Sequence, residues 1–287
     1  MPELPDLVHV QATLARTVCN LRITEVRVGD PVVLRLMVPG ALTDLLRGKC
    51  IVRVDRVGQF LRFDLDQDLV LVVNAMLSGR YFVVDSDART KHKNLVLAVR
   101  FESGRELRYD DDTRMGKIYV ATAAQTSRIP GFRDLGVDLL SSAFTLEHFR
   151  QVFAKRRDQV RQFLLDKTAL ASIGNAYADE ILFAAKLHPK TLCKQLGTGD
   201  VDRLYAAIRD TLAWAIGTIE ERNQPIEVKV RDFLKVRGRA GKPCLDCNTV
   251  IRRVRVGRDD ACFCPHCQPS TRKLFVDFSR LPPGDHG

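Results

Sequence analysis

The first residues of the chain could form a catalytic pair, because removal of Met1 leaves the secondary amine of Pro2 beside the carboxyl of Glu3. A free α-amino group has a pKa of about 8, so part of it is unprotonated near neutral pH and can act as a nucleophile. A secondary amine condenses with an aldehyde-level carbon to a cationic iminium, and the neighbouring carboxyl could protonate a leaving or ring oxygen. The alternative is an ordinary N-terminus in which Glu3 lies in the first turn of a helix.

Four cysteines near the C-terminus have the spacing of a tetrahedral zinc site. Cys244 and Cys247 form one C-x2-C pair, and Cys264 and Cys267 form a second. Because all four ligands are thiolates, no coordination position remains for water, so the predicted zinc ion is structural. A pair of disulfides is the alternative, which a reducing compartment disfavours.

The segment between the two cysteine pairs alternates apolar and basic residues. It reads Ile-Arg-Arg-Val-Arg-Val-Gly-Arg over residues 251–258. This pattern favours a β-hairpin whose exposed face meets phosphates. Cys262 and His266 are interpreted as non-ligands.

Residues 173–180, Ile-Gly-Asn-Ala-Tyr-Ala-Asp-Glu, open a predicted helix that runs through Ile181, Leu182 and Leu187. Free backbone amides and an asparagine side chain at the start of a helix can bind phosphate. An ordinary helix cap is the alternative for this segment.

Charge and composition limit the kinds of partner. The 287 residues include 45 Lys and Arg against 35 Asp and Glu, which gives a formal net charge of +10 and a pI near 9.4. Such a balance favours polyanions, nucleic acid first. No apolar run reaches the roughly 18 residues that span a bilayer, and the N-terminus has no signal-peptide pattern, so we expect an intracellular protein with no membrane partner. Cys19, Cys50 and Cys193 have apolar neighbours and are predicted to be buried thiols.

Hydrophobic spacing predicts a helix, a sheet region and a helical region, in that order, and the length predicts two domains with a small appendix. After Pro5, apolar residues from Leu7 to Val18 recur at helical spacing, so an amphipathic helix would fix Pro2 to a folded scaffold. Short apolar runs separated by turns predict an antiparallel β-sandwich over residues 22–122. These runs are Ile23 to Val28, Leu69 to Val73, Tyr81 to Val84, Leu95 to Phe101 and Lys117 to Ala121. Further on, Phe149 to Leu164 mark one amphipathic helical face and Leu204 to Ile219 another.

Three separated segments carry a resemblance to one family: Met-Pro-Glu-Leu-Pro-Asp at residues 1–6, the segment 173–180, and the four-cysteine ribbon. On these, the chain resembles the formamidopyrimidine-DNA glycosylase and endonuclease VIII superfamily over essentially its whole length. The resemblance implies an α+β fold, with an N-terminal antiparallel β-sandwich and flanking helix, a helix-two-turn-helix domain and a C-terminal zinc-ribbon β-hairpin. The expected boundaries are 1–130 for the catalytic sandwich, 131–143 for a linker, 144–222 for the helical domain, 223–270 for the ribbon and 271–287 for a tail.

The resemblance also implies an activity, that of a base-excision-repair DNA glycosylase with AP lyase activity. Its substrate is double-stranded DNA with damaged bases or abasic sites, and the damaged nucleotide leaves the base stack for the chemistry. Pro2 attacks the sugar C1′ and expels the base, Glu3 assists ring opening, and the iminium drives strand cleavage by elimination. A monomer with one structural zinc ion, in the cytoplasm with the nucleoid, is implied as well.

Further residues are assigned through the family's motifs. Asn175 is expected to hold a phosphate beside the flipped nucleotide, and Arg258 on the ribbon hairpin to reach the same phosphodiester in the chemistry. Arg255 is the alternative to Arg258, because the ribbon is one residue longer than usual after it. His92 corresponds to a phosphate-contacting histidine. The other expected DNA-binding residues are Asp6, Gln59, Leu77, Arg114, Met115 and Arg161.

The sequence departs from the family pattern at Gln59, where members that cleave efficiently carry a lysine. Glutamine keeps a hydrogen-bond donor but lacks the charge and the acidic proton of an ammonium group. Either the elimination step is slow, or another cation takes the place of the lysine. The candidates for this cation are Arg56 and Lys117.

The residues that fill the space left by a flipped base also differ. A Met, Arg and Phe set is matched here by Leu77, Thr113 and Met115, with Arg114 one place away as a possible compensation. Apolar wedges unstack a base step at a cost of about a few kcal/mol. The alternative is that Leu77 and Met115 are ordinary strand and turn residues. Residues 230–239 leave little room for a loop that caps 8-oxoguanine, so the preferred lesion stays open.

Two other classes of protein remain as alternatives. One is a damaged-DNA-binding protein that keeps the fold and has lost turnover together with the lysine. The other is a zinc-ribbon transcription or RNA-binding factor, which would explain the charge and the cysteines but not the N-terminus. Retention of both Pro2 and Glu3 favours the enzyme, because a binding protein has no evident need for a proline amine.

Overall fold

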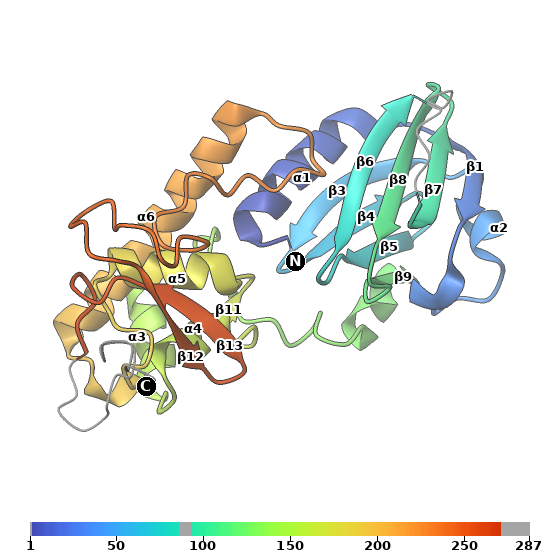
Figure 1. Ribbon diagram of the computed structural model, residues 1–287. Coiled ribbons are helices and arrows are strands. Elements are labelled where there is room, and N and C mark those ends of the chain that lie inside the picture. The colour runs from blue at the N-terminus through green and yellow to red at the C-terminus, as the bar shows by residue number, and fades with distance from the viewer. Residues whose placement is uncertain (1, 86–92, 271–287) are drawn as a thin grey trace, which may run out of the picture. The chain divides into compact units, whose positions relative to one another are not determined.

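The structure is a computed structural model that describes residues 2–85 and 93–270, and it divides into two compact units (Figure 1). Unit 1 comprises Met1–Leu135 and Ile216–Val230, and unit 2 comprises Gly136–Ala215 and Arg231–Gly287. The helical segment and the ribbon, predicted as separate domains, therefore belong to one unit. His92 and the tail at 271–287 lie outside the described residues.

Unit 1 is built on two sheets that share a hydrophobic core. The four-stranded sheet has the order β1-β7-β8-β6 and consists of β1 (Ile23–Val28), β7 (Leu95–Phe101), β8 (Arg105–Asp111) and β6 (Gly79–Asp85). The five-stranded sheet has the order β2-β9-β5-β4-β3 and consists of β2 (Leu34–Leu36), β9 (Lys117–Thr122), β5 (Leu69–Asn74), β4 (Phe60–Leu65) and β3 (Ile51–Val57). The strand pairs are antiparallel except β2 with β9, which is parallel.

The central strand β5 is a continuous apolar run, without the alternation of apolar and polar residues that is typical of a strand with one exposed face. Leu69, Leu71 and Val73 face the core between the sheets, whereas Val70 and Val72 face the opposite side. That outer side is covered by residues of the 3-10 helix η2 (Ala123–Arg128) and the chain that follows it. Burial on both faces favours a continuous apolar run over an alternating one.

Unit 1 also contains the helices α1 and α2 and the last part of α6 (Thr198–Arg222). Helix α1 (Leu4–Val18) lies against β3 and β6, and α2 (Leu42–Leu46) lies against β1 (Figure 1). A short 3-10 helix η1 (Pro31–Val33) precedes β2. Helix α1 begins at Leu4 rather than after Pro5, because a proline in the first turn lacks only an N–H that has no partner there.

The described residues of unit 2 form α-helices and short strands. Its helical elements are α3 (Leu146–Ala154), α4 (Val160–Leu165), α5 (Asn175–Ala184), η3 (Cys193–Gln195) and the first part of α6 (Thr198–Arg222). Its strands are the parallel pair β10 (Val137–Asp138) and β11 (Leu170–Ala171) and the antiparallel hairpin β12 (Arg252–Val256) and β13 (Asp259–Phe263). In the described part of the chain, no helix has both the length and the apolar character needed to cross a membrane.

The amphipathic face predicted over Phe149 to Leu164 is divided between α3 and α4. The two helices still bury a shared aromatic cluster, in which the Phe153 and Phe163 rings meet edge to face with centroids 5.1 Å apart. Helix α5 ends at Ala184, so Leu187 lies beyond it, although its side chain is buried. The apolar residues of this pattern are thus largely buried as predicted, but turns divide the predicted helices into shorter ones.

Candidate functional site

The N-terminal pair is held by the first turn of α1. Glu3 is the N-cap residue, and its backbone N–H donates to Oδ2 of Asp6 over 2.8 Å. Pro2, Glu3 and Asp6 are all buried. An acidic side chain in the first turn also interacts favourably with the helix dipole. Asp6, expected to contact DNA, is therefore an anchor for the Glu3 backbone.

Gln59 lies in the tight turn between β3 and β4. The preceding Gly58 has φ +56°, and a Cβ at this position would approach Leu135 Cδ1 to 2.6 Å, so the turn requires glycine. Arg56 Nη1 donates to the Gly58 carbonyl over 3.1 Å. Of the two candidate cations, Arg56 is thus bonded to the turn that carries Gln59, whereas Lys117 opens β9 opposite Asn74.

The predicted wedge residues lie on two loops at one end of unit 1. Leu77 lies between β5 and β6 and is 53% exposed, and Met115 lies between β8 and β9 and is 46% exposed. Arg114 has φ +57° and is turned toward the protein. Its Nε donates to Oδ2 of Asp30 and its Nη1 to the Asp111 carbonyl, both over 2.6 Å. These bonds occupy much of the guanidinium that was expected to bind DNA.

In unit 2, Asn175 is the first residue of α5, and a hydrogen bond from a buried arginine orients its side chain. Nη2 of Arg161 donates to Oδ1 of Asn175 over 2.9 Å, and Nε of Arg161 donates to Oδ1 of Asp179 over 2.8 Å. The Arg161 side chain is completely buried. The prediction that Arg161 itself contacts DNA is therefore corrected, because protein encloses its guanidinium, which instead orients Asn175.

The same network reaches the ribbon hairpin. Oδ2 of Asp179 accepts from Nη1 of Arg237 and from the Cys262 backbone N–H, both over 2.9 Å. The carbonyl of Asp260 accepts from Arg237 over 2.8 Å and from Arg161 over 3.3 Å. Burial raises the pKa of Asp179, and its hydrogen bonds with Arg161 and Cys262 oppose that rise. A single buried carboxylate thus joins α4, α5 and β13.

Glu180 adds a second link beside Asp179. Its carboxylate accepts the backbone N–H groups of Lys235, Val236 and Arg237 over 2.8 to 2.9 Å. Burial raises the pKa of Glu180, while these three bonds lower it. Sequence reasoning did not assign Asp179 or Glu180 a role, although two adjacent acids on a largely apolar helix were a signal that buried partners exist.

The hairpin presents its arginines at and near the tip. Arg258 is exposed in the two-residue turn with Gly257, which has φ +64°. Arg255 is also exposed, and its Nε donates to the Gly257 carbonyl over 3.4 Å. Both arginines stand on the hairpin that Asp179 links to α5.

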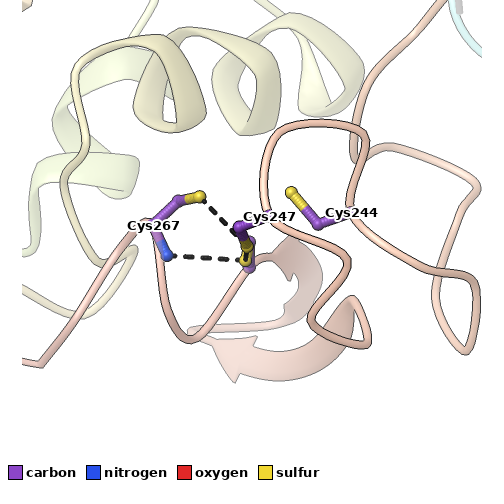
Figure 2. A group of neighbouring side chains, drawn as sticks. Cys244, Cys247 and Cys267 are labelled. Atoms are coloured by element: carbon purple, nitrogen blue, oxygen red, sulfur yellow. Dashed lines mark hydrogen bonds between the residues drawn. The ribbon is translucent and has the colours of Figure 1, made fainter.

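The four predicted ligand cysteines converge in unit 2. Figure 2 labels three of them, Cys244, Cys247 and Cys267. All four Sγ atoms lie within 4.8 Å of one another, and Cys247 Sγ is 3.4 Å from Cys264 Sγ and 3.5 Å from Cys267 Sγ. Zn–S bonds of about 2.3 Å give a tetrahedron with edges of roughly 3.8 Å, so the cluster fits a zinc ion. A hydrogen bond from the Thr249 hydroxyl is the main reason that the pKa of Cys247 falls to about 6, which favours the thiolate that binds metal.

The other cysteines do not belong to this cluster. Cys262 is buried in the hydrophobic core of the ribbon, and neither it nor His266 is part of the four-residue group. Cys193 is buried as predicted, whereas Cys19 and Cys50 are only partly buried, so the prediction of burial was wrong for these two.

Comparisons with known proteins agree with this fold and site. The formamidopyrimidine-DNA glycosylase N-terminal domain matches residues 1–118, and the H2TH domain of the same enzymes matches residues 135–224. The formamidopyrimidine-DNA glycosylase of Shouchella clausii is 35% identical, with 94% of this chain and 99% of the relative covered. That of Listeria innocua is 33% identical, with 93% and 100% covered.

Solved structures give the same result. A complex of Lactococcus lactis Fpg with DNA that contains an abasic site has a TM-score of 0.84 and 26% identity, and 94% of this chain and 100% of that chain are covered. A complex of the same enzyme with DNA that contains an oxidised pyrimidine matches equally well. Fold and site define a DNA glycosylase of base excision repair. The chain belongs to the formamidopyrimidine-DNA glycosylase family, which confirms the resemblance and the α+β fold predicted from the sequence.

Proposed function

We propose that the protein is a bifunctional DNA glycosylase and AP lyase that acts through the Pro2 amine. The observation that carries this proposal is the burial of Pro2 and Glu3 just before α1, with the Glu3 backbone N–H bonded to Asp6. A nucleophile on a rigid element is positioned more accurately than one on a loose terminus. Removal of Met1 frees the amine.

The reaction needs the amine and one carboxyl. The Pro2 nitrogen forms a bond to C1′ as the glycosidic bond breaks, and the electron pair of that bond leaves with the base, which takes up the proton that the Pro2 nitrogen loses. After the amine loses its proton, the ring C1′–O4′ bond breaks and Glu3 gives a proton to O4′, which leaves an iminium at C1′. Loss of a C2′ proton then expels the 3′ phosphate, and hydrolysis of the iminium releases Pro2.

The substrate is double-stranded DNA with a damaged base or an abasic site. This choice is supported by the related Lactococcus lactis complexes, which hold an abasic site, an oxidised pyrimidine and a Fapy-dG lesion. Asn175 and Arg258 bind the phosphodiester beside the flipped nucleotide, and the net charge of +10 adds salt-sensitive affinity. Zinc held by Cys244, Cys247, Cys264 and Cys267 stabilises the ribbon and takes no part in bond breaking.

Gln59 sets the relative rates of the two steps. Without an ammonium at the β3–β4 turn, base excision proceeds and elimination is slow, with Arg56 as the nearby cation. In single-turnover assays on abasic DNA, Gln59→Lys is expected to speed strand cleavage about tenfold or more. Arg56→Gln is expected to slow it, and an unchanged rate in both variants would remove this turn from the elimination step.

Gln59 is also the observation that favours a second candidate, a protein that binds damaged DNA without turnover. Both candidates predict damage-selective binding that weakens with salt. They differ in the covalent intermediate, because only the enzyme forms a bond between Pro2 and the sugar.

The test is trapping with borohydride on duplexes that contain an abasic site, 8-oxoguanine or an oxidised pyrimidine. We expect a trapped adduct with the native N-terminus, none when an extra residue precedes Pro2, and much less with Glu3→Gln. Glu25→Gln, an exposed carboxyl paired with Arg100, is the matched control. Selective binding without an adduct on any duplex would support the second candidate instead.

A further inference from the structure

The end of α3 in unit 2 borders a cavity that is lined by none of the described residues assigned above to catalysis, DNA or zinc. The cavity has a volume of about 310 Å³, and its walls come from the end of α3, the turn before α4, η3 and the start of α6. Ligand pockets in proteins have volumes of about 300 to 1,000 Å³. The space is therefore sufficient for one side chain of a partner and the backbone beside it.

The floor of this cavity is apolar. Phe153, Cys193 and Val201 line it and are buried, and Leu196 is half-buried beside them. Burial and the nearby Asp158 carboxylate raise the pKa of the Cys193 thiol to about 12, so the sulfur is uncharged near neutral pH. The floor therefore suits an apolar side chain.

The rim of the cavity is basic. Within the part of the chain that the structure describes, the lining residues include no acidic side chain but four cations, which are Arg150, Arg156, Arg157 and Lys194. Arg156 Nη2 donates to Oδ2 of Asp158 over 2.7 Å, and its Nη1 donates to Oδ2 of Asp166 over 2.8 Å. Nε and Nη2 of Arg150 donate to the Asp202 carboxylate over 2.8 and 2.6 Å. Two of the four cations are thus occupied by carboxylates of the protein.

The other two cations, Arg157 and Lys194, are available to a ligand. Both are exposed, and neither side chain has an ion pair or a hydrogen bond with the described residues. The Cys193 backbone N–H donates to the Asp158 carbonyl over 2.9 Å, so the two segments that carry these cations are joined directly beside them. Their backbone positions are therefore fixed relative to each other before any ligand binds.

We propose that this cavity docks an acidic peptide of a partner protein, whose C-terminal aromatic side chain lies over the floor and whose carboxylates bind Arg157 and Lys194. Proteins recognise acidic motifs through clusters of basic residues. The aromatic residue is placed at the end of the peptide because the volume admits only one side chain. Duplex DNA would use the two cations, but its phosphates leave an apolar floor without a partner. The docking of this partner is independent of the chemistry at Pro2.

The first experiment measures Kd of the full-length protein for a fluorescent peptide in which a run of aspartates ends in phenylalanine with a free carboxylate. We expect a Kd in the micromolar range. A peptide that ends in serine should bind about tenfold more weakly, because the floor loses its apolar partner. Absence of binding, or equal affinity for the two peptides, would overturn the proposal.

A second experiment compares variants at the cavity. Ala154 is the exposed last residue of α3, so Ala154→Trp fills the cavity from outside and is expected to abolish peptide binding while the fold is retained. Arg157→Gln and Lys194→Gln are each expected to weaken binding about threefold to fivefold. Lys155→Gln removes an exposed charge outside the lining and is the matched control. Equal losses in Lys155→Gln and Lys194→Gln would overturn the proposal, because the net charge alone would then attract the peptide.

Competition with DNA separates the peptide from the other polyanion. A duplex that contains a tetrahydrofuran abasic-site analogue is added to the peptide complex, and we expect both ligands to be bound together. Ala154→Trp should leave duplex binding unchanged. Displacement of the peptide by the duplex, with weaker duplex binding in Ala154→Trp, would assign the cavity to DNA and overturn the proposal.

Failure of the proposed function gives a different result. In that case, no adduct is trapped on abasic DNA, whereas the peptide still binds the wild-type protein and not Ala154→Trp.

Discussion

Each unit uses a completely buried aspartate to hold a segment that carries predicted DNA-binding residues, but the partners differ in kind. Asp111 in unit 1 accepts from hydroxyls and backbone amides two, five and 33 residues away. Asp179 in unit 2 accepts from two arginines and one amide that are 18, 58 and 83 residues away. The first arrangement shapes two loops that adjoining strands already bring together. The second fixes segments from distant parts of the chain, namely α4, α5 and the hairpin.

The difference appears in the ionisation of the two acids. Burial favours the neutral form of Asp111, but bonds from Ser78, Gly116 and Thr113 outweigh it and lower its pKa. Burial raises the pKa of Asp179, and even Arg161 and Arg237 leave a net rise. At Asp111 the hydrogen bonds outweigh the cost of burial, whereas at Asp179 the cost of burial outweighs the hydrogen bonds and the two arginines. This contrast leads to four predictions.

The largest effect is expected from removal of the zinc proposed for the four-cysteine group, whose ligands all lie in unit 2. Among residues 2–85 and 93–270, the four-cysteine group is the one cluster of this type, and it lies in unit 2. Structural zinc contributes about 10 kcal/mol or more to the folding of small zinc domains. We expect a chelator to abolish amide-exchange protection over residues 236–268 and to leave β6 and β8 protected. Added zinc should restore the protection, and unchanged exchange in the ribbon would contradict the assignment.

The next effect is expected from Asp179→Ala. The substitution leaves the buried Arg161 and the half-buried Arg237 without their carboxylate. Breaking a buried pair by removing one partner costs about 3–5 kcal/mol. Urea unfolding of the zinc-loaded protein should show a loss of this size together with weaker DNA binding through Asn175. Asp202→Ala breaks the exposed bridge to Arg150 and should change stability little, so a similar loss in both variants would contradict the prediction.

Asp111→Ala is expected to cost less. It leaves the hydroxyls of Ser78 and Thr113 and the N–H of Gly116 without an acceptor, but these loops border solvent and water can replace part of the bonding. The expected loss is about 2 kcal/mol in urea unfolding, with zinc content unchanged. A loss as large as that of Asp179→Ala would show that the local arrangement is as critical as the long-range one.

The sequence predicted the local features well. Strands β1 and β7 have the predicted limits, because turn residues and apolar runs mark both ends. The four cysteines meet as predicted, because their pairwise spacing already specifies the knuckles. In these cases a local pattern marks the feature, although 16 residues separate the two cysteine pairs.

The sequence could not show which charged residues are buried or with what they pair. Arg161 is indistinguishable in sequence from an exposed basic residue, and only the fold brings Asp179, 18 residues later, against it. Strands β3, β4 and β8 were not among the predicted runs, and neither was β2, which has three residues and pairs in parallel with β9, far along the chain. The division between α3 and α4 was missed because the apolar spacing continues across the turn. Long-range pairing, unlike local pattern, has no periodic signature.

The smallest and sharpest effect is expected in the pH dependence of stability, where the two aspartates should act in opposite directions. Asp111 has a pKa below its ordinary value of 3.8, so its contribution is complete above that value and is lost as the pH falls toward the folded-state pKa. Asp179 has a raised pKa, so above 3.8 the folded protein retains a proton that the unfolded chain releases. Its contribution therefore falls as the pH rises, until the folded carboxyl has ionised.

The measurement is the free energy of unfolding of wild type, Asp111→Asn and Asp179→Asn from about pH 3 to pH 7, since this range spans both carboxyls. The advantage of wild type over Asp111→Asn should grow from the lowest pH and level off slightly above pH 4. The advantage over Asp179→Asn should shrink across the range above pH 4 and then level off. Zinc content is measured at every pH, and only points with equal metal are compared, because thiolate ligands are lost in acid. If both free-energy differences, wild type minus Asp111→Asn and wild type minus Asp179→Asn, changed with pH in the same direction, the prediction of opposite pKa shifts for the two aspartates would be wrong.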